Sequence, residues 1–369
     1  MAIRRGAALE VTAVGLALLA AFVPIPATAV ERWFSTGVYP PIQRFLTPIS
    51  NLLPFAILDL LSVAALLAAV LAIAGGVRAA RRAHRVAPVL RTAGHMVAAV
   101  ACGYLVFLTL WGFNYRRVPM RERLLVEREA PSSEAVVQLG LDAVGRMNSL
   151  YTDAHGAGWE GDEWRNGSLR TAFEAVQHAL SDAPEAEPGR LKRSLYGTYF
   201  RWASVDGMVN PFGLEVLANP DLLPFERPFV AAHEWSHLAG YADESEANFV
   251  GWLTCVRADV PAQYSGWLYL FWQVNGEVNE AGRARLGEAL APGPRADIQA
   301  IVARLRRAQV PWLQTAGWAV YDQYLKANRV ESGVRSYGEV VTLILQARFA
   351  EGWTPVRRDR AATGRPNGS

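Results

Sequence analysis

Two histidines four residues apart are the feature of this sequence most directly linked to chemistry. His233 and His237 enclose Glu234 in the run His-Glu-Trp-Ser-His, inside a helical pattern. Side chains at this spacing project from one face of a helix, so both imidazoles can bind one metal ion. Glu234 can then accept a proton from a water molecule on that metal. The alternative is a pair of structural histidines, but with only six histidines in the chain this pattern rarely arises by chance.

The third metal ligand has to come from the residues that follow this motif. A catalytic zinc site uses three protein ligands and keeps one position open for water. Gly240 can end the motif helix and turn the chain back, and Asp243, Glu244 and Glu246 follow it. Glu244 has Asn248 one helical turn later, able to hydrogen-bond the outer nitrogen of a ligating histidine. We therefore expect one Zn²⁺ ion with Glu244 as third ligand, Glu246 as second choice and Asn248 as orienting partner.

Two further parts of a hydrolytic site can be named only as candidates. The developing oxyanion usually needs a hydrogen-bond donor besides the metal, and the candidate donors are Tyr264, Tyr321, Arg335 and Tyr337. Peptide substrates often add a strand to a sheet edge, for which Leu214–Ala218 is the available segment. Four tryptophans, Trp235, Trp252, Trp267 and Trp272, could line a pocket, although core packing explains them as well.

Three apolar stretches near the N-terminus predict transmembrane helices, over about 11–30, 54–77 and 92–114. The first stretch could instead be a cleaved signal peptide, because Ala27-Thr28-Ala29 resembles a cleavage site. Pro24 and Pro26 interrupt that stretch, and two more spans follow it. We therefore expect a multi-pass protein of the bacterial cytoplasmic membrane, with the lipid bilayer as a partner.

The distribution of arginine predicts the orientation. Five arginines lie between the second and third spans, and only two lie between the first and second. The positive-inside rule then keeps the N-terminus in the cytoplasm and the C-terminal region outside it. Four arginines just after the third span argue the other way: Arg116, Arg117, Arg121 and Arg123.

The rest of the chain predicts a mostly helical domain. Residues 115–353 contain a run of helical patterns and a β-hairpin turn at Asn210-Pro211-Phe212-Gly213, and residues 354–369 read as a disordered tail. The predicted fold is thus mainly α, with three membrane helices in residues 1–114 and a zincin-like domain with a small sheet. Its 369 residues carry a net charge of +3, without a basic run interleaved with aromatics, which argues against nucleic-acid binding. Two cysteines exclude a disulfide framework.

Several motifs together resemble a bacterial membrane-anchored family catalogued as domain of unknown function 3810. They are Met208-Val209-Asn210-Pro211-Phe212, Pro228-Phe229, the His-Glu-x-x-His-x-x-Gly block and Glu-x-Glu-Ala-Asn-Phe, with weaker blocks at Asn114-Tyr115-Arg116, Tyr264-Ser265-Gly266, Tyr324–Asn328 and Gly333–Gly338. The resemblance covers most of the chain and implies a zinc-dependent peptidase. The Glu-x-x-Ala-Asn arrangement is also similar to a block of gluzincin-type membrane endopeptidases, which supports Glu244 by position. Asn248 stands where those enzymes have an aspartate.

Three functions compete at this point. The first is a membrane-anchored zinc metallopeptidase that cuts a peptide or protein substrate of the envelope. The second is a catalytically inactive, zinc-binding scaffold of the envelope, and the third is a zinc hydrolase of a peptidoglycan cross-link. The presence of Glu234 favours an enzyme, because a structural zinc ion needs no base.

Overall fold

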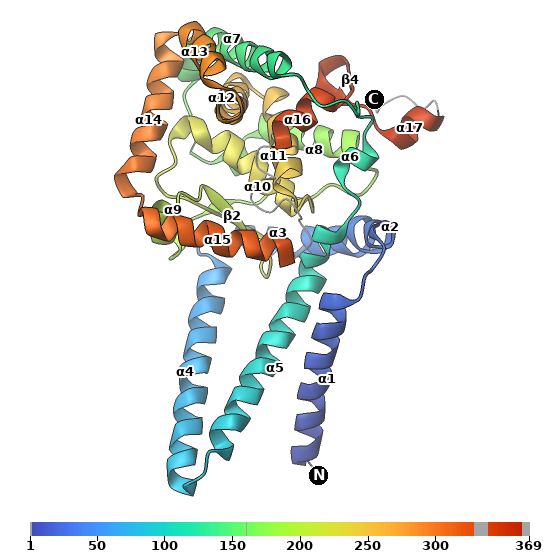
Figure 1. Ribbon diagram of the computed structural model, residues 1–369, viewed down its shortest axis with the longest axis vertical. Helices are drawn as coiled ribbons and strands as arrows, with labels where there is room; N and C mark the ends of the chain where they lie inside the picture. Colours follow the sequence, from blue (N-terminus) through green and yellow to red (C-terminus); the bar gives the residue numbers. More distant parts are fainter. Residues whose placement is uncertain (1, 160, 328–338, 364–369) are drawn as a thin grey trace.

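The structure is a computed structural model that describes residues 2–159, 161–327 and 339–363. It is mainly helical, with long apolar helices on one side of a helical domain (Figure 1). Among these residues, α4 (Ile57–Ala83) and α5 (Ala87–Leu110) are long and apolar enough to cross a membrane. A third crossing exists if the bent pair Gly6–Phe22 and Ala27–Leu52 counts as one span.

The first apolar stretch does not form the straight helix expected over 11–30. Helix α1 (Ala2–Phe22) ends just before Pro24 and Pro26, and the chain then bends by 116° into the helical segment Ala27–Leu52. That segment consists of α2 (Ala27–Val30), the π-helix η1 (Glu31–Val38) and α3 (Tyr39–Leu52). The bend follows from the prolines, which lack the N–H that would continue the helix.

The segment η1–α3 is built into the C-terminal domain. The Tyr39 hydroxyl donates to the carbonyl oxygen of Leu238 at 2.6 Å, and the Thr47 hydroxyl donates to that of Leu214 at 2.8 Å. Tyr39 also belongs to the same hydrophobic core cluster as the metal-motif helix. The expected division at residue 114 is therefore not a structural boundary, because the domain's core includes residues from before it.

Helices form most of the domain, and local capping signals set several of their starts. The helices are η2 (Gly112–Arg116), α6 (Met120–Arg123), α7 (Ser133–Ala157), η3 (Glu163–Arg165), α8 (Gly167–Leu180), α9 (Gly197–Ala203), η4 (Pro224–Glu226), α10 (Arg227–Leu238), α11 (Glu244–Val256), α12 (Val260–Glu277), α13 (Glu280–Ala289), α14 (Pro292–Ala308), α15 (Pro311–Ala327) and α16 (Glu339–Gln346). Side-chain oxygens of Ser132, Asp243 and Asp259 accept backbone N–H bonds at the starts of α7, α11 and α12. In Figure 1, α15 crosses the face of the domain from which the long helices leave.

A three-stranded sheet lies beside the metal-motif helix. Strands β2 (Gly207–Asn210) and β3 (Glu215–Ala218) form the expected hairpin, with Met208 opposite Leu217. The strand order is β1-β3-β2, where β1 (Leu191–Lys192) pairs in parallel with β3. The expectation that Leu214–Ala218 offers a free edge is therefore wrong: β3 is central, and β1 and β2 are the edge strands.

The chain after residue 353 is partly ordered. Strands β4 (Phe349–Ala350) and β5 (Thr354–Pro355) pair across the turn η6 (Glu351–Trp353), and α17 (Arg358–Thr363) follows. The Arg357 guanidinium donates to both carboxylate oxygens of Asp182, at 2.7 and 2.8 Å. The expected disordered tail is thus wrong for residues 354–363, because the contact to Asp182, just after α8, holds them against the domain; residues 364–369 lie outside the described residues.

Candidate metal centre

Helices α10 and α11 position the metal motif by packing closely against each other. Gly240, at a φ of +82°, turns the chain between them, in a left-handed conformation that favours glycine. Gly251 on α11 lies against the backbone of α10, since a Cβ there would come within 3.0 Å of the His233 nitrogen. The predicted turn at Gly240 is confirmed, and Gly251 is an additional requirement of the close helix contact.

Three side chains meet at the point where the two helices face each other. His233 Nε2 lies 3.2 Å from His237 Nε2, and Glu244 Oε2 lies 3.4 Å and 3.5 Å from these two nitrogens. A tetrahedral zinc ion with bonds of ~2.0–2.1 Å separates its ligand atoms by ~3.3–3.4 Å. The three atoms form a triangle of this size, so His233, His237 and Glu244 could hold a metal ion.

The other two acidic residues considered as ligands are engaged elsewhere. Asp243 caps α11: its Oδ1 accepts the backbone N–H groups of Ser245 and Glu246. The Glu246 carboxylate accepts the backbone N–H of Met120 and lies 3.9 Å from the Arg123 guanidinium. Among the three carboxylates, Glu244 is the one that the structure brings to the histidines, as the spacing indicated.

The outer nitrogens of the two histidines have different surroundings. His237 Nδ1 lies 2.7 Å from the carbonyl oxygen of Tyr241, which fixes Nδ1 as the protonated nitrogen and leaves Nε2 for a metal. His233 Nδ1 and Asn248 Nδ2 are both buried without a hydrogen-bond partner in the described structure. The expected bond between a histidine and Asn248 is therefore not formed, and the carbonyl of Tyr241 is an orienting group that the sequence did not reveal.

Electrostatics within the triangle favour a charged Glu244. Burial alone would raise the pKa of Glu244. The neighbouring His237 and His233 rings outweigh this effect and hold that pKa well below its usual range. Burial lowers the pKa of His237, but the Glu244 carboxylate more than offsets this and raises it to about 9. One ionised carboxylate and two imidazole nitrogens together form a donor set that is typical of zinc sites.

Glu234 lies beside the triangle in a confined environment. It is buried, and its Oε2 has no hydrogen-bond partner among the described residues. Its Oε1 lies against Gly207 of β2, where a Cβ would come within 2.5 Å of that oxygen. Burial raises the pKa of Glu234. An unpaired buried carboxylate oxygen is costly, and groups of this kind are typical candidates for functional sites.

The triangle opens into a cavity of about 610 Å³. Its walls are mostly apolar and come from η2, α9, β2, α10, α12 and α14, with α15 at one side. The named lining residues include Trp111, Tyr115, Tyr199, Met208, Phe229, Leu268, Tyr269, Trp272 and Ile301. Of the four tryptophans singled out from the sequence, Trp272 lines this cavity, whereas Trp235, Trp252 and Trp267 are buried in the core.

One candidate oxyanion donor lies away from the cavity, and the other three lie outside the described residues or side chains. The Tyr264 hydroxyl donates to Asp297 and does not line the cavity. Arg335 and Tyr337, and the side chain of Tyr321, lie outside the described residues. The site instead contains Tyr269, whose buried hydroxyl has no hydrogen-bond partner among the described residues.

Tyr269 is held rigidly near the triangle. Its ring stacks on Phe229 of α10, with ring centroids 3.5 Å apart. Burial and the nearby Glu244 carboxylate raise its pKa well above the usual value, so the hydroxyl keeps its proton. A sequence signal existed: Ser265, Tyr269 and Gln273 are polar residues at helical spacing within the mostly apolar middle of α12, and all three line the cavity.

A second charged group lines the same cavity, away from the triangle. One Arg304 amino group donates to Asp206 at 2.9 Å and to Glu226 at 2.7 Å. Burial, together with the Asp206 carboxylate, outweighs Arg304 and raises the pKa of Glu226 to about 7. Arg304 and its two carboxylate partners thus connect α14 to the loop before β2 and to the start of α10.

Taken together, the fold and the site define a mainly helical protein with two or three candidate membrane helices and a His-His-Glu cluster that could hold a metal. The family described as "Protein of unknown function (DUF3810)" matches residues 34–345, and the chain belongs to it. No curated protein and no solved structure matches the chain. The match begins within η1, so it includes the segment η1–α3 that is built into the domain.

Proposed function

We propose that this protein is a membrane-anchored, zinc-dependent metallopeptidase that hydrolyses a peptide or protein substrate of the cell envelope. One observation carries the proposal: His233, His237 and Glu244 form a triangle of 3.2–3.5 Å beside a buried glutamate with an unpaired oxygen. A structural zinc site is closed by four protein ligands, whereas a catalytic site leaves one position for water. Three ligands facing a cavity fit the catalytic type.

The side chains of the site divide the chemistry among them. A bound zinc ion would activate water and polarise the carbonyl group of the scissile bond. Glu234 accepts the proton of the attacking water through Oε2 and passes it to the leaving amine. Tyr269 donates its hydroxyl hydrogen to the oxygen that becomes negative in the transition state. The Tyr241 carbonyl keeps His237 in the tautomer that binds through Nε2.

The edge strand β2 offers a means of aligning a peptide substrate. Gly207, Met208 and Val209 line the cavity, and Gly207 touches Glu234. An extended peptide that pairs with β2 would place its backbone beside the catalytic glutamate. Main-chain hydrogen bonds to an edge strand supply affinity with little dependence on sequence, which suits a peptidase.

The orientation proposed from the arginine distribution puts the domain outside the cytoplasm. The domain and the loop between α4 and α5 lie at opposite ends of the long helices (Figure 1). Two of the arginines that argued against this orientation are committed to contacts: Arg116 donates to the Ala20 carbonyl, and Arg117 pairs with Glu31 at 2.7 Å. The positive-inside rule still counts both arginines, so the proposed orientation rests on the five arginines between the second and third predicted spans.

Replacing Glu234 with glutamine tests this proposal. The full-length protein, purified in detergent with zinc, is incubated with a mixed peptide pool, and new termini are identified by mass spectrometry. We expect wild type to cut peptides and Glu234→Gln to lose at least ~10²-fold of the rate while keeping its zinc. Zinc binding by wild type without any cleavage would favour the scaffold function, and cleavage of cross-linked peptidoglycan fragments alone would assign the third function.

A further inference from the structure

We propose that the substrate is a polypeptide anchored in the same bilayer, and that the protein cuts it within about four residues of the membrane surface. This inference deepens the proposed function and rests on it. It depends on where the metal centre lies relative to the membrane helices, on the direction of β2, and on the apolar surface around the cavity.

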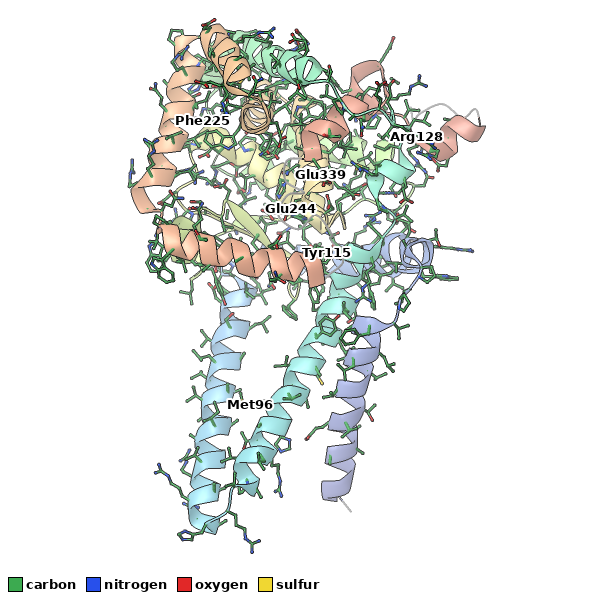
Figure 2. All side chains as sticks on the ribbon, in the orientation of Figure 1. Met96, Tyr115, Arg128, Phe225, Glu244 and Glu339 are labelled. Atoms are coloured by element: carbon green, nitrogen blue, oxygen red, sulfur yellow. The ribbon has the colours of Figure 1, made fainter. Side chains whose placement is uncertain are left out.

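The metal centre lies directly at the end of a membrane helix. Trp111 follows the last residue of α5, and its indole N–H donates to the carbonyl oxygen of the candidate ligand His237 at 2.9 Å. The Trp111 ring centroid is 6.4 Å from that of His237. Figure 2 shows Tyr115 where α5 joins the domain, with Glu244 close by on the same side of the domain. Trp111 and His237 are 126 positions apart in sequence, and the fold brings them into contact.

Strand β2 leads from the start of the other membrane helix to the catalytic glutamate. At one end, Asn210 donates to Glu215, whose carboxylate accepts the backbone N–H groups of Ile57 and Leu58, the first residues of α4. At the other end, Gly207 touches Glu234. Four strand residues cover ~10 Å. A peptide paired with β2 therefore passes from the bilayer surface to Glu234 within about four residues.

Apolar side chains are exposed around this path. Leu195 is 72% exposed, Trp202 45%, Phe212 37% and Trp312 71%. Two of them lie at the start of α4: the Leu195 N–H donates to Asp59 in the first turn of that helix, and Gly213, next to Phe212, packs on Ile57. The N–H of Val310, just before α15, donates to the Trp202 carbonyl. We call these four residues the membrane rim.

The membrane rim has the composition of a bilayer interface. Tryptophan and other aromatic residues concentrate at the level of the lipid headgroups. The rim also continues from α4, whose apolar side chains are exposed as lipid contact requires. Because the rim rests in the interface, the cavity is entered from the bilayer surface. A polypeptide that leaves the bilayer between α4 and α5 reaches β2 without crossing open water, whereas a soluble protein must approach past the lipid.

A cleavage experiment tests the substrate class. The full-length protein is reconstituted with zinc in vesicles of phosphatidylethanolamine and phosphatidylglycerol. A randomised peptide pool is supplied either fused to a transmembrane helix or free in solution, and the cut positions are read by mass spectrometry. We expect cuts in the fused pool to cluster within about four residues of the bilayer, with Glu234→Gln as the control.

Each other outcome of this experiment overturns a defined part of the account. Equal cutting of the free pool, or cuts spread evenly along the fused pool, would overturn the membrane inference and leave the peptidase proposal intact. No cutting of either pool by a zinc-loaded protein would overturn the peptidase proposal and this inference with it.

A second measurement tests the rim without any catalysis. Spin labels are attached to Phe212→Cys and Trp312→Cys in a Cys102→Ser background, because Cys102 is exposed and Cys255 is buried. The matched control is Gly145→Cys, on an exposed part of α7 at the far side of the domain (Figure 1). We expect the rim labels to be accessible to oxygen and protected from a water-soluble nickel chelate, and the control label to show the reverse. Chelate access at both rim positions would overturn the inference.

Discussion

Two buried glutamates on neighbouring elements, Glu215 of β3 and Glu234 of α10, have opposite surroundings. Both Glu215 oxygens are hydrogen-bonded: Oε2 to Lys192 at 2.9 Å and to the Ile57 N–H at 3.0 Å, and Oε1 to the Leu58 N–H at 2.8 Å and to Asn210 at 2.9 Å. Although burial opposes this, Lys192 and these bonds lower the pKa of Glu215. Glu234 has an unpaired oxygen and a raised pKa.

The difference separates a structural carboxylate from the one that we propose to be reactive. A buried charge with every partner in place fixes the arrangement of the elements around it, and removing one partner is expensive. A buried carboxylate with an unpaired oxygen can still bind a proton or a polar ligand. Glu215 holds the start of α4 against the sheet, whereas Glu234 faces the cavity. Glu215 therefore helps to position the candidate site to which Glu234 belongs.

We expect the largest effect on folding when the N-terminal residues that bind Lys192 and Glu215 are removed. A fragment of residues 115–369 lacks Ser50, Phe55 and the first turn of α4, which bind Lys192 and Glu215. It also lacks Tyr39 and Thr47. We expect this fragment to lack a cooperative unfolding transition by circular dichroism. A well-folded fragment would contradict the view that the segment η1–α3 belongs to the domain.

The next effect compares the two glutamates directly. Glu215→Gln leaves the Lys192 charge buried without its counter-ion, and we expect a loss of about 3–5 kcal/mol in the free energy of unfolding. Glu234→Gln removes no hydrogen bond within the described structure, so unfolding should change by less than ~1 kcal/mol. Chemical denaturation of both full-length variants in detergent measures this. Equal destabilisation by the two substitutions would erase the proposed distinction.

The sequence predicted the candidate metal site better than it predicted the contacts of Lys192 and Glu215 with the N-terminal segment. The three candidate metal ligands lie within twelve residues of one another, so helical spacing and the turn at Gly240 suffice to bring His233, His237 and Glu244 together. The Lys192–Glu215 pair depends on groups 142 and 157 residues away from it, and no local pattern encodes such a contact.

Other misses have the same physical origin. Strand β1 is two residues long, too short for any alternation of apolar side chains, so the central position of β3 was not predictable. The order of residues 354–363 depends on a salt bridge between Arg357 and Asp182, 175 positions apart. Helix starts were predictable because Ser132 and Asp243 cap them locally.

A smaller effect concerns the pH dependence of stability at Glu226, a partly buried glutamate whose charge Arg304 compensates only in part. Its pKa is about 7 in the folded protein against 4.5 as the usual value. The folded state therefore holds this proton more tightly, so the contribution of Glu226 to stability is greatest below pH ~4.5 and falls as the pH rises towards 7, by up to about 3 kcal/mol. Over this pH range the melting temperature of wild type should therefore fall relative to that of Glu226→Gln. An unchanged slope in the variant would contradict it.

The smallest effect concerns the orientation of His233. Asn248 Nδ2 and His233 Nδ1 are both buried and unpaired, and rotating the amide by 180° would offer the histidine an oxygen acceptor. If Asn248 has this role, Asn248→Ala should lower zinc affinity by ~10–100-fold in a competition titration with a chelator. Asn248→Asp, which keeps an acceptor, should retain most of the affinity. Equal losses in both variants would exclude an acceptor role.

The central claim, that His233, His237 and Glu244 hold one zinc ion, is tested most directly by the zinc content of three full-length proteins. Wild type, Glu244→Gln and Glu246→Gln are purified without chelators, and zinc is measured by inductively coupled plasma mass spectrometry. The account predicts about one zinc per chain in wild type and in Glu246→Gln, and less than about a tenth of that in Glu244→Gln, because two histidines alone bind weakly. Full zinc in Glu244→Gln, or none in wild type, would contradict it.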